Sequence, residues 1–290
     1  MDDLALERGP WLEVTTTVGC KNLCAYCPQD VFVPAYPKGA TTRLALEDFR
    51  RAIDRVPPHV KILFAGFSDP WLNPECTEML IYAHGAGHAI EVYTVGTGMT
   101  PEDVERIAHV PFRRFALHLP DDGGLMRTRV DARYLALVEA IVSRPLENLN
   151  CLYLRRHRGT EQIHPEVGAI LSRHATPLER WPLTSRAGNV RRDILPKRRK
   201  RTGPLAPCPR LEQNVLLPNG DVHLCCMDWK LEHRLGNLLE EPYSDLFRGE
   251  EMRHVRASYP DDTRETLCRF CDWARPAEPL PREPAPPERT

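Results

Sequence analysis

Apolar positions along the first 190 residues follow two alternating patterns. Short, mostly apolar runs such as 60–65 and 90–95 are separated by segments in which apolar residues recur every three or four positions, as at Leu46, Phe49 and Ile53. The first pattern is typical of buried strands and the second of amphipathic helices. Strands are therefore predicted at 11–15, 60–65, 90–95, 114–119, 149–154 and 178–183, and helices at 46–56, 74–85, from 100, at 134–141 and from 165.

Strands that alternate with helices in this way predict an α/β fold, with a parallel sheet covered by helices on its outside. Six β–α units are too few for a full eight-fold barrel, so we expect a partial (β/α)6 barrel over residues 1–190. In barrels of this kind the chemistry lies at the carboxyl ends of the strands. The segments that follow the predicted strands are therefore where functional residues are expected.

The pattern changes after residue 190. Residues 191–207 carry a basic run with prolines around it, which we interpret as a solvated linker, although it could also attract an anionic substrate. A hairpin is predicted next, with strands near 215–217 and 222–226, and then a helix at 243–255. A small hairpin-plus-helix domain is thus expected over 208–275. The proline- and charge-rich residues 276–290 are predicted to be disordered.

Composition and charge narrow the class of protein. Lysine plus arginine (39) nearly equal aspartate plus glutamate (40) in 290 residues, which gives no general case for binding nucleic acid or an acidic membrane surface. No apolar run approaches the length of a membrane span, and the N-terminus is unlike a secretory signal. Ten cysteines grouped at short spacings, without such a signal, indicate metal ligands in a reducing compartment. A cytoplasmic metalloprotein is predicted.

The first cysteine group directly follows the first predicted strand. Cys20, Cys24 and Cys27 have C-x3-C-x2-C spacing on one loop. Three thiols can hold three irons of a [4Fe–4S] cube and leave the fourth iron open to a substrate. The alternatives are a zinc knuckle that borrows a ligand from elsewhere, or three unrelated core cysteines.

This loop resembles the signature of the radical S-adenosylmethionine (SAM) superfamily, in which SAM chelates the open iron. The resemblance implies that Tyr26, just before the third cysteine, lies near the adenine. After the second strand, Gly66, Phe67, Ser68 and Asp69 resemble the family's Gly-Gly-Glu-Pro segment, whose backbone receives the amino group of SAM. Ser68-Asp69 stands where Gly-Glu is usual, which leaves the side-chain contribution open.

A second cysteine group lies in the C-terminal region. Cys208, a hairpin ending at Cys225, and the pair Cys268 and Cys271 resemble the auxiliary-cluster module called SPASM in its long form and twitch in its short form. No cysteine follows Cys271, so this module is expected to hold one cluster. Cys225 matches the module's Gly-x4-Cys position, with Cys226 as the alternative ligand. Taken alone, this half could also be a zinc ribbon.

Polar residues at the ends of other strands are candidates for contacts with SAM and substrate. The resemblance implies such roles at these positions, although each residue alone could be an ordinary surface or core polar group. Arg155 and Arg186 are the strongest substrate candidates, because a guanidinium can bind a carboxylate or phosphate through two hydrogen bonds. His118 is a further catalytic candidate, and Thr94 is expected to contact SAM.

The resemblance as a whole implies a radical enzyme with two [4Fe–4S] clusters and SAM. Reductive cleavage of SAM, with an electron donor such as flavodoxin or ferredoxin, would give a 5′-deoxyadenosyl radical that takes hydrogen from a C–H bond. A closed second cluster can accept an electron, so a two-electron oxidation of a small, sugar-like or otherwise polar substrate is expected. The first strand begins near residue 11, which leaves no room for the leader-binding domain of peptide-modifying relatives. Three alternatives remain: peptide or protein modification, a redox-neutral epimerisation or rearrangement, and a non-catalytic electron-relay protein.

Overall fold

The computed structural model describes residues 9–277, except 145, 156–161, 191–194 and 196–198. Residues 191–194 and 196–198 of the predicted basic linker, and all but two residues of the predicted C-terminal tail, therefore lie outside the described residues. Among the described residues, no helix is both long enough and apolar enough to cross a membrane.

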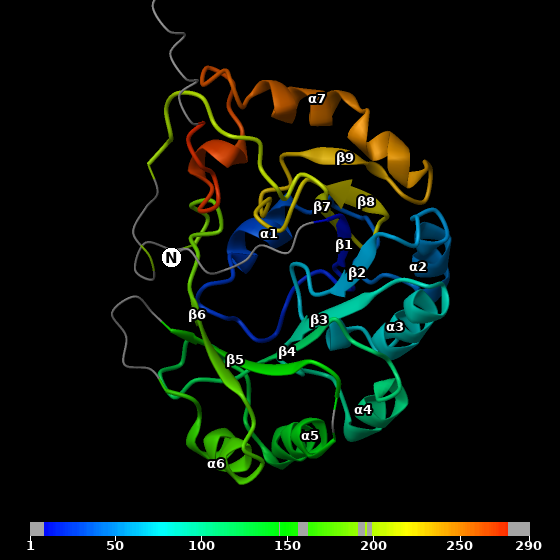
Figure 1. Cartoon of the computed structure of the whole chain (residues 1–290), viewed down its shortest axis with the longest axis vertical. Helices are drawn as coiled ribbons and strands as arrows, with labels where there is room; N and C mark the ends of the chain where they lie inside the picture. The colour runs from blue at the N-terminus through cyan, green and yellow to red at the C-terminus, as the bar shows by residue number, and fades with distance from the viewer. Residues whose placement is uncertain (1–8, 145, 156–161, 191–194, 196–198, 278–290) are drawn as a thin grey trace, which may run out of the picture.

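The described residues form one curved nine-stranded sheet in the order β6-β5-β4-β3-β2-β1-β7-β8-β9 (Figure 1). Strands β1 to β7 pair in parallel, whereas β8 and β9 pair antiparallel. The α/β prediction with a parallel core is confirmed. The strands are β1 (Trp11–Val14), β2 (Lys61–Phe64), β3 (Ile90–Thr94), β4 (Arg114–His118), β5 (Leu149–Arg155), β6 (Leu178–Pro182), β7 (Gln213–Leu216), β8 (Asp221–His223) and β9 (Arg234–Asn237).

Five helices cover the outer face of the curved sheet, as the alternating pattern predicts (Figure 1). They bury the apolar stripes of that pattern; Phe49, for example, is fully buried with its ring 5.8 Å from that of Phe64. These helices are α2 (Leu46–Ile53), α3 (Cys76–Gly85), α4 (Pro101–Ile107), α5 (Ala132–Ser143) and α6 (Pro165–Arg173).

Two helical segments differ from the sequence prediction. Helix α1 (Gln29–Ala35) was not expected, because it is short and contains Pro34; it is held by tertiary packing of Phe32 against Phe67 and Trp229. The single helix predicted at 243–255 is divided into the 3-10 helix η2 (Tyr243–Phe247) and α7 (Glu250–Ala257), because Gly249 has an extended conformation between them.

Strand β7 connects the C-terminal region directly to the barrel. It pairs in parallel with β1, from Trp11 opposite Gln213 to Val14 opposite Leu216. The hairpin β7–β8 is therefore a continuation of the barrel sheet. This pairing brings the second cysteine group to the side of the barrel that carries Trp11 and Glu13.

Candidate cluster and substrate sites

The carboxyl ends of the barrel strands surround one cavity of about 250 Å³. The structure brings together the first cysteine group and nearly all of the sequence-predicted binding residues around it. These cavity-lining residues are Cys20, Cys24, Tyr26, Cys27, Gly66, Phe67, Ser68, Asp69, Thr94, His118 and Arg186. Arg155 ends β5, but its side chain lies outside the described residues.

The loop with the first three cysteines is held in shape by Asn22. Its side-chain oxygen accepts hydrogen bonds from the hydroxyls of Thr97 (2.6 Å) and Thr128 (3.2 Å), and its carbonyl accepts one from the amide of Arg127. Leu23 has a positive φ of 44°, which turns the chain between the first two cysteines. Asn22 therefore fixes this loop against two distant segments.

The three thiols interact with one another. A hydrogen bond between Cys24 and Cys27 raises the pKa of the Cys24 thiol and lowers that of Cys27, while burial raises the pKa of Cys20 to about 11. Metal ligation needs thiolates, so assembly of a cluster here must release protons. Beside them Tyr26 is buried in a small apolar group with Val95.

Residues 66–69 form a turn that only glycine permits at its start. Gly66 has a φ of 78°, and a Cβ there would clash with the hydroxyl oxygen of Thr15. The amide of Gly66 donates to Glu13 Oε1 (2.9 Å), and that of Phe67 donates to Thr15 Oγ1 (3.0 Å). Ser68 Oγ is buried without a hydrogen-bond partner among the described residues and lines the cavity.

The side chain of Asp69 holds this turn to the next strand. Its carboxylate accepts hydrogen bonds from Thr94 Oγ1 (2.9 Å) and from the amide of Val95 (2.7 Å). Burial raises the pKa of Asp69 to about 6, although these hydrogen bonds favour its ionised form. Asp69 and Thr94 thus contact each other, so the Asp69 side chain has a structural role here, a question that the sequence left open.

The other strand-end candidates differ in their surroundings. His118 Nε2 is buried without a hydrogen-bond partner among the described residues, and burial lowers the pKa of His118 to about 4, so the imidazole is neutral. The guanidinium of Arg186 lies 6.0 Å from the centre of the Trp229 ring. Both side chains face the cavity and are available to a bound molecule.

Sequence reasoning missed several residues of this cavity. Glu13 lines it because β1 alternates: Leu12 and Val14 are fully buried on the helix side, and Trp11 and Glu13 face inward. A carboxylate within a short apolar strand was the available signal. Four of the five tryptophans in the chain also line the cavity, namely Trp11, Trp181, Trp229 and Trp273.

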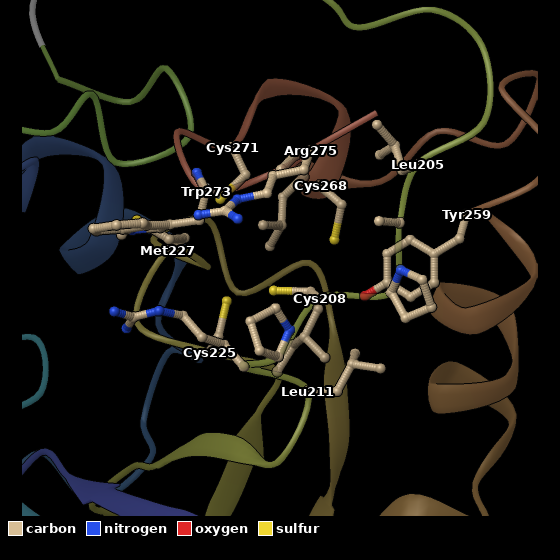
Figure 2. A pocket seen from close by; sticks show the side chains of 17 residues that line it. Leu205, Cys208, Leu211, Cys225, Met227, Tyr259, Cys268, Cys271, Trp273 and Arg275 are labelled. Carbon is tan, nitrogen blue, oxygen red and sulfur yellow. Dashed lines mark hydrogen bonds between the residues drawn. The ribbon is translucent and has the colours of Figure 1, made fainter. Parts of the chain in front are cut away.

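The second cysteine group lines another cavity, of about 470 Å³ (Figure 2). Cys208 precedes β7, Cys225 follows β8, and Cys268 and Cys271 lie in and just after the 3-10 helix η3 (Leu267–Phe270). Figure 2 shows the sulfurs of Cys208, Cys225 and Cys268 directed toward a common space, with Cys271 beside it. Four thiols around one cavity are the donor set that a closed iron–sulfur cluster requires.

The neighbouring thiols of Cys225 and Cys226 face different cavities. Cys225 lines the second cavity, whereas Cys226 lines the first, where its thiol lies beside Glu13. Burial raises the pKa of Glu13, and the nearby guanidinium groups of Arg186 and Arg210 lower it in part. The first cavity is therefore lined by a carboxylate, a thiol and two arginines that are not among the predicted cluster ligands.

Comparison with known protein families identifies two separate regions of the chain. Residues 14–136 match the model of the radical SAM superfamily, and residues 208–272 match that of SPASM, an iron–sulfur cluster-binding domain. No curated protein matches the chain.

Among solved structures, BtrN in complex with AdoMet and 2-DOIA is 14% identical, with 92% of this chain and 94% of that chain covered and a TM-score of 0.58. The enzyme anSMEcpe with bound AdoMet is 15% identical over 90% of this chain and 86% of that chain, with a TM-score of 0.55. Streptococcus suis SuiB bound to precursor peptide SuiA is 12% identical over 91% of this chain and 70% of that chain, with a TM-score of 0.64. These likenesses show a common fold. The chain belongs to the radical SAM superfamily and carries a C-terminal SPASM domain, so its cofactors are [4Fe–4S] clusters and SAM.

Proposed function

We propose that this enzyme takes a hydrogen atom from a small polar substrate in the first cavity and completes a two-electron oxidation of it. Cys20, Cys24 and Cys27 would hold the SAM-binding cluster, and Cys208, Cys225, Cys268 and Cys271 would hold the second cluster. Tyr26, Gly66, Phe67, Ser68 and Thr94 would surround SAM, with Asp69 holding that segment in place.

The observation that carries this proposal is the position of the first cavity between the two cysteine groups. Arg210, Met227 and Trp273 line both cavities, so a molecule in the first cavity would lie one layer of side chains from the second. When bound, the clusters would supply the electron that cleaves SAM and accept the electron that the substrate gives up.

The chain's own residues fit the oxidation of an alcohol. Removal of a hydrogen atom from the carbon, one electron, and the hydroxyl proton leaves a carbonyl. We assign the proton to Glu13, because its carboxylate faces the cavity and its raised pKa makes it a stronger base than an exposed carboxylate. Arg186 and the neutral His118 would orient the substrate from the opposite strand ends.

Unsatisfied polar atoms support a polar substrate. The indole nitrogens of Trp11 and Trp229 and the hydroxyl of Ser68 are buried without hydrogen-bond partners among the described residues. Such groups are costly unless a bound molecule satisfies them. Tryptophan rings beside these polar atoms provide flat apolar surfaces, which suits a cyclic polyol or amino sugar with a C–H face and several hydroxyls.

Cys226 favours a second candidate reaction, a redox-neutral epimerisation. A thiol in the substrate cavity could return a hydrogen atom to the substrate radical, and the thiyl radical would then need one electron and one proton for repair. The two reactions differ in D2O: epimerisation places solvent deuterium on a carbon of the product, whereas oxidation gives a carbonyl without it. Peptide modification is the third candidate, since SuiB binds a precursor peptide.

The direct test supplies the reconstituted, reduced enzyme with SAM and a panel of aminocyclitols and other small cyclic polyols. The proposal expects at least one of them to raise 5′-deoxyadenosine formation above background and to yield a carbonyl product in equal amount. A flavodoxin or ferredoxin should replace the chemical reductant. A panel without effect, together with stimulation by a peptide, would show that the substrate class is wrong.

The proposed ligand sets also predict opposite effects of two adjacent substitutions. Cys225→Ala should remove the second cluster and half of the bound iron, whereas Cys226→Ala should keep both clusters, because the two side chains face different cavities. Iron content and Mössbauer spectra of the two purified variants measure this directly. Loss of a cluster in the Cys226 variant alone would identify that thiol as the ligand instead.

A further inference from the structure

The wall between the two cavities is built by a repeated arrangement. Arg210, Met227 and Trp273 each stand two positions after a cysteine of the second group. Each has its backbone N–H close to that cysteine's sulfur, where it lowers the thiol pKa in part, and the N–H of Trp273 donates a hydrogen bond to Cys271 Sγ. The bond from Trp273 to Cys271 is 3.4 Å long. In each case the main chain thus faces the sulfur while the side chain reaches the substrate cavity, so three cysteines and three wall residues form a single layer.

Arg210 is the charged member of this wall. Its guanidinium lies between two indoles, with its carbon 4.7 Å from the centre of the Trp273 ring and 5.7 Å from that of Trp11. The residue is half-buried, and its Nε is fully buried without a hydrogen-bond partner among the described residues. A half-buried guanidinium with an unpartnered Nε is stabilised when an anionic group binds nearby.

An iron–sulfur cluster in the second cavity would be that anionic group. Its four thiolates carry more negative charge than its core carries positive charge, and reduction adds one further negative charge. Arg210 lines the second cavity beside Cys208; burial raises the pKa of the Cys208 thiol, and the Arg210 amide and charge lower it in part. On the other side of the wall the same charge lowers the pKa of Glu13.

We propose that Arg210 is a positioning residue for electron transfer, whose charge raises the reduction potential of the second cluster so that it accepts an electron across this wall. The proposal rests on the proposed function, in which the second cluster is the acceptor. A nearby cation stabilises the reduced, more negative cluster more than the oxidised one, and the low dielectric of a buried site strengthens the effect. The two indoles hold the guanidinium in place without neutralising it.

Arg275 provides a matched comparison. It lines the same second cavity, but it is exposed to solvent, and no part of it lines the substrate cavity. Water and salt screen an exposed charge far more than a buried one. Removal of the Arg275 charge should therefore change the potential much less than removal of the Arg210 charge.

The experiment uses the full chain with Cys20, Cys24 and Cys27 replaced by alanine, so that only the second cluster contributes to the EPR signal. Arg210→Met keeps an unbranched side chain that can pack against the indoles but removes the charge. We expect the ratio of reduced to oxidised cluster at a fixed potential to fall about tenfold, which is a midpoint shift of about 59 mV for one electron. Arg210→Lys and Arg275→Met should stay near the unsubstituted value.

Three results would overturn the inference: no shift in Arg210→Met, an equal shift in Arg210→Lys, or an equal shift in Arg275→Met. Iron content shows whether each variant has assembled its cluster. If Arg210→Met has not, Arg210→Gln is measured in its place, and the same three results would overturn the inference. Because the titration needs no substrate, it is independent of the proposed reaction. A redox-neutral product would refute the proposed oxidation, but it would not affect the conclusion about how Arg210 changes the reduction potential.

Discussion

Replacement of Cys20, Cys24 and Cys27 together by alanine is expected to abolish SAM cleavage and to remove half of the bound iron. These thiols lie on one loop that Asn22 holds against two distant segments, and they line the same cavity as the turn at Gly66, which is proposed to bind SAM. Without them the reductant has no route to SAM. Formation of 5′-deoxyadenosine and iron per chain measure the two effects in anaerobically reconstituted protein.

Cys76→Ala and Cys151→Ala are the matched controls. Both cysteines are fully buried in the main apolar core and line neither cluster cavity. These variants should keep both clusters and SAM cleavage, with at most a moderate loss of stability from the cavity that each leaves. SAM cleavage that survives the triple substitution, or stoichiometric zinc in place of iron, would contradict the ligand assignment.

Much of the fold could be predicted because local pattern and tertiary structure agree in it. Helix α2 is one example, since the apolar repeat that includes Phe49 and Ile53 is the face that packs on the sheet. Where an element depends on distant partners, the local pattern failed. Helix α1 contains Pro34 and is stabilised by Phe67 and Trp229, which lie far away in the sequence.

The pairing of β7 with β1 also depends on segments that are distant in the sequence. It joins Gln213–Leu216 to Trp11–Val14 across most of the chain, and nothing local to either segment specifies the partner. This pairing also decides where the second cysteine group lies. The sequence predicted two sets of cysteines, but only the structure shows that Arg210, Met227 and Trp273 line both of the cavities that these sets line.

The residues of the candidate site likewise fall into those that local sequence predicts and those that only tertiary structure reveals. The cysteines could be found from their spacing, and Gly66 and Asp69 from the strand end that carries them. Glu13 and Arg210 could not, because the sequence alone does not decide which side of β1 faces inward or where the residues after Cys208 point. The strand alternation around Glu13 and the interval of two positions after Cys208 were visible, but only tertiary structure gives them meaning.

Cys268→Ala and Cys271→Ala are expected to separate the two halves of the reaction. Both residues line the second cavity and neither lines the first, so SAM binding and cleavage should continue. If the second cluster accepts the electron, the substrate radical then forms but cannot be oxidised. The ratio of carbonyl product to 5′-deoxyadenosine should fall from near one to below detection, as measured by chromatography of both products from the same reaction.

A control must show that the loss of oxidised product comes from the missing electron acceptor and not from a structural change in the residues between the two cavities. Met227→Leu alters one of these residues but leaves all four thiols, and it should keep the amounts of product and 5′-deoxyadenosine equal.

Deuterium at the reacting carbon should still appear in 5′-deoxyadenosine from the Cys268 and Cys271 variants, because hydrogen abstraction precedes the missing step. Oxidised product from a variant that lacks the second cluster would remove that cluster from the electron path. A product with the oxidation state of its substrate would instead favour the thiol of Cys226 as the group that quenches the radical.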